Sequence, residues 1–125
     1  MLIQDTRAIV SGGASGLGLA VAEFVVVAGG KVALFDVNDQ AGVDAVRKLG
    51  SAASFHKVDV TVESAVAAAV AAATTAMGGL NLAVSCAGVG WPKRMVGKEG
   101  TMPGDFFRKD IEINRVGTLL LCKEA

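Results

Sequence analysis

A glycine-rich stretch at residues 11–18, Ser-Gly-Gly-Ala-Ser-Gly-Leu-Gly, constrains the fold of this chain more than any other feature. Apolar runs flank it at 8–10 and 17–28, and three of its glycines follow the spacing G-x-x-x-G-x-G: Gly12, Gly16 and Gly18. A strand that turns through glycines into a helix leaves N–H groups pointing outward at the positive end of the helix dipole. Such an end binds phosphate groups. A glycine turn also occurs between packed elements without any ligand, so the flanking sequence has to distinguish the two interpretations.

Composition predicts a single globular domain over residues 1–125 and excludes several classes of protein. Apolar residues make up 52% of the chain and charged residues 19%, which is too apolar for disorder. Twelve basic residues balance twelve acidic ones without a basic block, so neither nucleic acid nor a membrane is an expected partner. The N-terminus has no features of a cleaved leader, and the longest apolar run is too short to span a bilayer.

The two cysteines, Cys86 and Cys122, are accompanied by neither a second pair nor a histidine cluster. The sequence therefore predicts no metal site and no structural disulfide. We expect both cysteines to be reduced, buried thiols in a cytoplasmic protein.

Apolar runs alternate with segments of helical periodicity along the whole chain. Strands are predicted at residues 7–10, 31–36, 53–58 and 80–85. Helices are predicted at residues 16–28, 39–49 and 62–77 and from 105 to the end. This alternation predicts an α/β fold, a Rossmann-like doubly wound parallel sheet with strand order 3-2-1-4. Ligands of such sheets bind beyond the carboxyl ends of the strands, at the switch point between strands 1 and 4.

Local signals mark several details of these elements. In the first helix, one set of apolar residues recurs at helical spacing: Leu17, Val21, Phe24 or Val25, and Ala28. Residues 37–39 are expected to form a turn and cap the second helix, and Thr61 can cap the third. Glycines and prolines are frequent in residues 89–104, which are predicted to form a loop.

Carboxylates follow two of the predicted strands at the edge where a ligand would bind. Asp36 ends the second strand, where it can accept hydrogen bonds from a ribose diol and would repel a 2′-phosphate, which favours NAD over NADP. The alternative is an aspartate that caps the next turn. Asp59 ends the third strand, where it can lie near an adenine amino group or cap a helix. The single histidine, His56, has no serine or aspartate around it in a catalytic arrangement, so it is predicted to be a surface or edge residue. Residues 91–94 are predicted to form a mobile basic loop, with contact to a substrate as the alternative.

Four motifs, in order along the chain, resemble those of the short-chain dehydrogenases/reductases. Residues 11–18 resemble the family's T-G-x-x-x-G-x-G, with serine in place of threonine. Asp59-Val60 resembles its adenine-contacting Asp-Val pair, and residues 85–88, Ser-Cys-Ala-Gly, resemble its N-N-A-G with both asparagines replaced. Asn114, followed by Gly117, matches the family's N-x-x-G. The chain is most similar to the type-2 3-hydroxyacyl-CoA dehydrogenases in three segments: the residue sequence of the glycine stretch, the Cys-Ala-Gly and residues 98–106.

The glycine turn, the strand-end carboxylates and this resemblance together imply a binding site for NAD. The implied cofactor-binding residues are Gly12, Ser15, Gly16, Leu17, Gly18, Asp36, Asp59, Val60, Cys86, Ala87 and Gly88. The resemblance also implies that Asn114 belongs to the family's catalytic tetrad. The expected partners are NAD and a small alcohol or ketone, and the resemblance implies a homo-oligomer for a full-length protein.

One departure limits what the resemblance implies. The family transfers hydride with a Tyr-x-x-x-Lys pair and a preceding serine, and the 125 residues contain no tyrosine. We therefore expect the cofactor-binding half of an NAD-dependent oxidoreductase that interconverts a secondary alcohol and a ketone, with 3-hydroxyacyl-CoA as a candidate substrate. The family's strands 5–7 would be absent, which would leave the fourth strand as an open edge and residues 119–121 partly uncovered. The alternative is a truncated, non-catalytic nucleotide-binding or interaction module. The glycine spacing and Asn114 argue against a methyltransferase.

Overall fold

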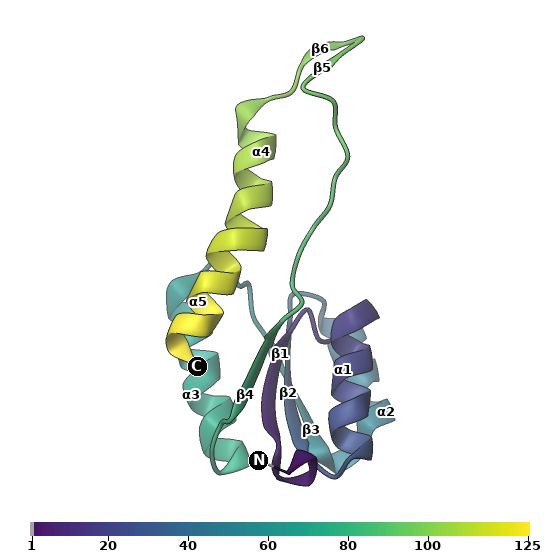
Figure 1. Cartoon of the computed structure of the whole chain (residues 1–125), viewed down its shortest axis with the longest axis vertical. Coiled ribbons are helices and arrows are strands. Elements are labelled where there is room, and N and C mark those ends of the chain that lie inside the picture. Colours follow the sequence, from purple (N-terminus) through teal and green to yellow (C-terminus); the bar gives the residue numbers. More distant parts are fainter. Residues whose placement is uncertain (1) are drawn as a thin grey trace.

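The apolar runs form one parallel, four-stranded sheet in the computed structural model, which describes residues 2–125 and leaves Met1 outside (Figure 1). Its strands are β1 (Arg7–Ser11), β2 (Lys31–Asp36), β3 (Ala53–Lys57) and β4 (Leu82–Ser85). Their order is β3-β2-β1-β4, which confirms the predicted topology. The register places Ser11 opposite both Phe35 and Ser85, so the carboxyl ends of β1, β2 and β4 lie level with one another.

Helices cover both faces of this sheet. They are α1 (Gly16–Val27), α2 (Asp39–Leu49), α3 (Glu63–Met77) and α5 (Gly117–Glu124). Alternate side chains of a strand point to opposite faces, so Val10 and Leu34 pack with α1 and α2, whereas Ile9 and Phe35 pack with α3 and α5. The central strands are therefore buried on both sides, which explains why they are apolar almost throughout.

The buried face of α1 agrees with the prediction at Val25 but not at Leu17 or at Phe24, the alternative to Val25. Leu17 is 82% exposed and Phe24 is 63% exposed, whereas the buried residues of this helix are Gly18, Ala22 and Val25. A Cβ added at Gly18 would lie 2.1 Å from the carbonyl oxygen of Gly12. The first turn of α1 thus packs backbone against backbone, so the smallest residues rather than the largest apolar ones face the sheet.

The C-terminal part of the chain forms one long helix with an irregular middle. It consists of α4 (Gly104–Ile111), a π-helical turn (Glu112–Val116) and α5. The predicted extent of this helix is confirmed, but the π-helical turn in its middle was not predicted. The predicted loop before it contains a short antiparallel hairpin, β5 (Val96–Gly97) and β6 (Gly100–Thr101), at the end of the molecule far from the sheet (Figure 1). Short 3-10 turns occupy Ile3–Asp5 and Gly50–Ala52.

Two further local expectations need correction, and one is confirmed. Asn38 caps α2, because its side-chain oxygen accepts a hydrogen bond from the backbone N–H of Ala41. Thr61 does not cap α3: the capping position is Val62, and the Thr61 hydroxyl donates to Asp59 instead. Cys122 is exposed on α5 rather than buried, because it lies on the side of that helix away from the sheet, whereas Cys86 is half-buried.

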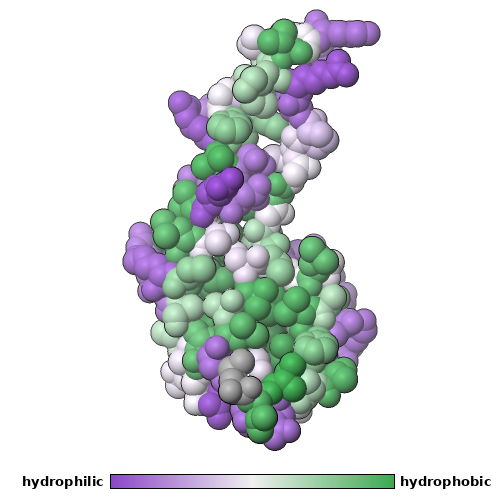
Figure 2. Space-filling model, viewed as in Figure 1, coloured by the Kyte–Doolittle hydropathy of each residue, from purple (hydrophilic) through white to green (hydrophobic). Residues whose placement is uncertain are grey.

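β4 is an edge strand of the sheet, as expected. Leu120 and Leu121 are buried against α3, but Leu119 is 63% exposed. Figure 2 shows an apolar surface over the part of the molecule that contains β4 and α1. Among the helices of the described residues, none is long and apolar enough to cross a membrane.

The close approach at Gly18 leads to a prediction about stability. Gly18→Ala should lower the free energy of unfolding by about 2 kcal/mol, the scale of an overpacked core, because the backbone of Gly12 cannot move aside cheaply. Urea unfolding followed by circular dichroism measures the change. Gly104→Ala is the matched control, since Gly104, like Gly18, lies in the first turn of a helix but has open space around its Cβ position. Equal stability of the two variants would contradict the prediction.

Candidate functional site

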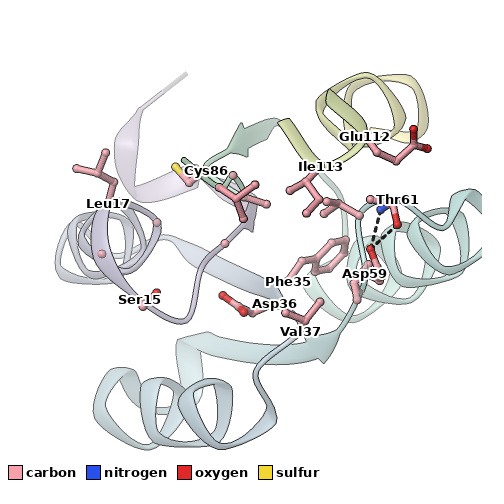
Figure 3. Close-up of a pocket in the computed structure, with 18 of the residues that line it drawn as sticks. Ser15, Leu17, Phe35, Asp36, Val37, Asp59, Thr61, Cys86, Glu112 and Ile113 are labelled. Atoms are coloured by element: carbon pink, nitrogen blue, oxygen red, sulfur yellow. Dashed lines mark hydrogen bonds between the residues drawn. The ribbon is translucent and has the colours of Figure 1, made fainter. Parts of the chain in front are cut away.

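A cavity of about 720 Å³ opens at the carboxyl ends of the sheet strands (Figure 3). All eleven residues that the sequence assigns to cofactor binding line it. They come from the glycine turn, the end of β2, the segment after β3 and the segment after β4. The parallel topology therefore brings together residues that are spread over 77 positions, from Gly12 to Gly88 (88 − 12 + 1). Their contact with a nucleotide stays a prediction.

The glycine turn forms one wall of the cavity. A Cβ at Gly12 would lie 2.7 Å from the backbone nitrogen of Ala87, so only glycine lets the turn cross the end of β4. Gly16 has a φ of +52° and open space where a Cβ would project. Ser15 is the N-cap of α1, but its side chain makes no capping hydrogen bond. The start of α1 therefore presents uncapped N–H groups at the cavity, which suits an anionic group.

Asp36 is fixed between the glycine turn and the start of the next turn. One carboxylate oxygen, Oδ2, accepts a hydrogen bond of 3.1 Å from the N–H of Ala14, and Oδ1 accepts one of 3.1 Å from the N–H of Asn38. An ionised carboxylate can accept about four hydrogen bonds, so each oxygen retains a lone pair for a ligand. The turn-capping role that the sequence left open is therefore compatible with the ribose role, because one carboxylate has capacity for both.

Asp59 is oriented by Thr61, two residues further along the chain. Its Oδ1 accepts hydrogen bonds from the Thr61 hydroxyl at 2.7 Å and from the Thr61 N–H at 2.9 Å (Figure 3). The hydroxyl bond, followed by the backbone bond, holds the pKa of the Asp59 carboxyl below its ordinary value, against a small opposing effect of burial. Asp59 therefore presents an ionised acceptor to the cavity, and its Oδ2 takes no part in the two bonds with Thr61.

Asn114 lies behind the cavity wall rather than on its surface. Its side chain forms two hydrogen bonds of 2.7 Å with the backbone of Val89: Nδ2 donates to the carbonyl, and Oδ1 accepts from the N–H. Nδ2 also donates to Asp110 at 3.2 Å. Gly88 passes close by, and a Cβ there would lie 3.1 Å from Oδ1 of Asn114. Asn114 thus anchors the segment that forms the wall, and its catalytic role stays a prediction.

Several lining residues were missed by the sequence reasoning. They are Phe35, Val37, Val58, Thr61, Val89, Arg108, Lys109, Glu112 and Ile113. Those beside Asp36, Asp59 and Gly88 are their direct chain neighbours, and adjacency to a motif was a signal that would have found them. The four on α4 and the π turn carry no motif, although the helix after β4 had to pass over the switch point. In Figure 3, Ile113 points toward the cavity and Glu112 points away from it.

The other candidate residues lie outside this cavity. His56 packs edge-on against Phe35 with ring centroids 5.5 Å apart, and burial lowers the pKa of its imidazole. The basic loop is held against α4, because Trp91 packs on Phe106 and Lys109 lies over the Trp91 ring at 5.6 Å. Within residues 2–125, no three histidine, cysteine, aspartate or glutamate side chains are grouped as a metal site would require.

Comparison with known sequences extends over nearly the whole chain. Residues 6–125 match the model of the family described as short chain dehydrogenase. The chain is 38% identical over 118 residues to a 2,5-dichloro-2,5-cyclohexadiene-1,4-diol dehydrogenase of Sphingobium indicum, with 92% of this chain and 45% of the relative covered. It is 37% identical over 118 residues to the 3-hydroxyacyl-CoA dehydrogenase type-2 of Homo sapiens, with 93% of this chain and 45% of the relative covered.

Comparison with solved structures agrees with the sequence comparison. A short-chain type dehydrogenase/reductase from Mycobacterium ulcerans superposes with a TM-score of 0.89 at 31% identity, and the match covers 100% of this chain and 46% of that one. The chain thus spans about half the length of the relatives that it matches. The matched family, the sheet order and the cavity at the switch point agree with one another, and the chain belongs to the short-chain dehydrogenase family.

Proposed function

We propose that this chain binds NAD in the cavity and forms the cofactor-binding half of an NAD-dependent oxidoreductase that interconverts a secondary alcohol and a ketone. The observation that carries the proposal is the convergence of the glycine turn, Asp36 and Asp59 on one cavity. Each of these features supplies a different kind of contact: N–H donors at a helix start, a fixed carboxylate, and an ionised acceptor beside apolar side chains.

The residues present fit a dinucleotide. The uncapped start of α1 and the open space at Gly16 suit a pyrophosphate. Asp36 retains acceptor capacity for a ribose diol and would repel a 2′-phosphate. Asp59 can accept a hydrogen bond from an adenine amino group, with Val60 and Ile113 as apolar neighbours of the base. When bound, NAD supplies a nicotinamide ring that accepts or returns a hydride.

The relatives suggest the class of substrate. The Sphingobium indicum relative is named as a diol dehydrogenase, and the human relative as a 3-hydroxyacyl-CoA dehydrogenase. Oxidation of a secondary alcohol removes a hydride from the carbinol carbon and a proton from its oxygen. The tyrosine that the family resemblance implies as proton acceptor is not among these 125 residues. We therefore propose that this chain's residues bind and orient the cofactor, with a 3-hydroxyacyl-CoA as the candidate substrate of the complete enzyme.

The experiment for this proposal is calorimetric titration of the 125-residue chain with NADH and with NADPH. We expect NADH to bind more tightly, because the Asp36 carboxylate repels the 2′-phosphate of NADPH. Titration with S-adenosylmethionine is the negative control, because this ligand also contains adenosine but belongs to another class of cofactor, and it should not bind. Absence of NADH binding, or tighter binding of NADPH, would contradict the proposed cofactor. Binding of NADH by a protein that stays inactive even with the family's Tyr-x-x-x-Lys pair present would favour the non-catalytic module.

Two substitutions of Asp36 should separate its effect on the affinity for NADH from its effect on the preference for NADH over NADPH. Asp36→Ala removes both the acceptor and the charge and should weaken NADH binding about tenfold, the scale of one charge-assisted hydrogen bond. Asp36→Asn removes the charge and should narrow the difference between NADH and NADPH. Asp39→Ala is the matched control, because Asp39 pairs with Lys57 outside the cavity. Asp39→Ala should leave both affinities unchanged, and an equal loss in that variant would count against a specific role for Asp36.

Substitution of Thr61 should change the titration of Asp59. Thr61→Val removes the hydroxyl donor, so the pKa of Asp59 should rise toward its ordinary value. Since the folded-state pKa is lowered, the bond stabilises the fold above the unfolded-state pKa, and this stabilisation is lost as the pH falls through the folded-state pKa. NMR titration of the Asp59 carboxyl carbon measures the shift, with Thr75→Val as the control on α3. An unchanged pKa in Thr61→Val would show that the hydroxyl does not orient Asp59.

A further inference from the structure

The segment that follows β4 is attached to the C-terminal helix at two points, one helical turn apart. At one point, the hydroxyl groups of Ser85 and Thr118 lie 3.0 Å apart. At the other, the Asn114 side chain forms its two hydrogen bonds with the backbone of Val89. The cavity-lining residues 86–88 lie between these attachments. One wall of the cavity is therefore suspended between two contacts with the same helix.

The hydroxyl groups at the first attachment have defined donor directions. Thr118 Oγ1 donates to the carbonyl oxygen of Asn114 at 3.0 Å. Because a hydroxyl has a single proton, Thr118 must accept from Ser85, and the proton of Ser85 is then in use. Ser11 Oγ can therefore donate to Ser85, at 3.5 Å, while it accepts from the N–H of Ala87 at 3.3 Å. Every proton in this hydroxyl chain (Ser11, Ser85 and Thr118) is used once.

The two attachments support each other. The Thr118 hydroxyl holds the Asn114 carbonyl, and the side chain of the same Asn114 holds Val89. Ser11 is fully buried, and its backbone carbonyl also accepts a hydrogen bond from the N–H of Cys86 at 3.0 Å. The bond of 3.5 Å between Ser11 and Ser85 is the longest and weakest of the set, so the contact of Ser85 with Thr118 carries most of the coupling.

We propose that Ser85 and Thr118 are positioning residues. By holding Asn114, they determine the position of the cavity wall formed by residues 86–89. The proposal rests on the proposed function for what this wall contacts, namely NAD. Ser85 stands where the family motif has an asparagine, so in this chain a hydroxyl group provides the link to the helix. Neither residue lines the cavity, so an effect on binding has to act through Asn114 and residues 86–89.

Ligand affinity tests the functional part of this proposal. Thr118→Val keeps the shape of the side chain but removes its hydroxyl group. Ser85→Ala removes the hydroxyl group on the other side of the same hydrogen bond. Each variant should raise the Kd for NADH about three- to tenfold, the scale of one hydrogen bond. Thr118→Ser keeps a hydroxyl group and should therefore keep the wild-type Kd. Thr75→Val is the matched control, because the Thr75 hydroxyl makes the same bond to a carbonyl four residues earlier, at 3.0 Å, on α3 away from the cavity. An equal rise in Kd for Thr75→Val, or none for Thr118→Val, would overturn the proposal.

A double-mutant cycle tests the same contact without any ligand. In urea unfolding, the combined effect of Ser85→Ala and Thr118→Val should be smaller than the sum of the single effects, because either change already breaks the contact. Additive effects would overturn the proposal even if the wild-type chain binds NADH. If the wild-type chain binds no NADH, the proposed function fails, and non-additive unfolding would still support the hydroxyl contact as the link between β4 and the helix.

Discussion

The structure depends on the close backbone contact between the turn after β1 and the end of β4. A Cβ at Gly12 would meet the backbone of Cys86 and Ala87, and a Cβ at Gly18 would meet the carbonyl of Gly12. These two approaches bring the end of β1, the start of α1 and the end of β4 together at the switch point of the sheet. The wall of the cavity that the glycine turn forms is therefore rich in exposed backbone, which supplies N–H groups and leaves space for a ligand.

The fold and the part of the site that sequence motifs mark could be predicted because their signals are local. Glycine spacing identifies the turn after β1, and a carboxylate directly after an apolar run identifies Asp36 and Asp59 as strand-end residues. The rule for right-handed crossovers then brings these strand ends to one edge. Arg108 and Lys109 could not be predicted in the same way, because their place at the cavity depends on where a long helix crosses the sheet. That crossing is set by tertiary packing and leaves no local pattern.

The errors in the sequence predictions also have a common physical cause. A hydrophobic pattern assigns the largest apolar side chains to the core, but α1 lies so close to β1 that Gly18 and Ala22 occupy the interface and Leu17 is exposed at the cavity. Thr61 has the side chain of a helix cap, but α3 starts one residue later, after Val62, and the Thr61 hydroxyl donates its hydrogen bond to Asp59. The π turn contains Asn114, whose side chain forms hydrogen bonds with the backbone of another segment at Val89.

The two ends of the cavity differ in how far along the chain their supports lie. Asp36 is held by Ala14 and Asn38, and Asp59 by Thr61, so this end is complete within the first half of the chain. The wall at residues 86–89 is held from Asn114 and Thr118, which lie on the irregular C-terminal helix. Under the proposed function, the contacts that select the nucleotide are therefore encoded within the first half of the chain. The contacts that position the wall after β4 depend on packing against the C-terminal helix. A change in that helix can therefore alter this wall while Asp36 and Asp59 keep their hydrogen bonds to Ala14, Asn38 and Thr61.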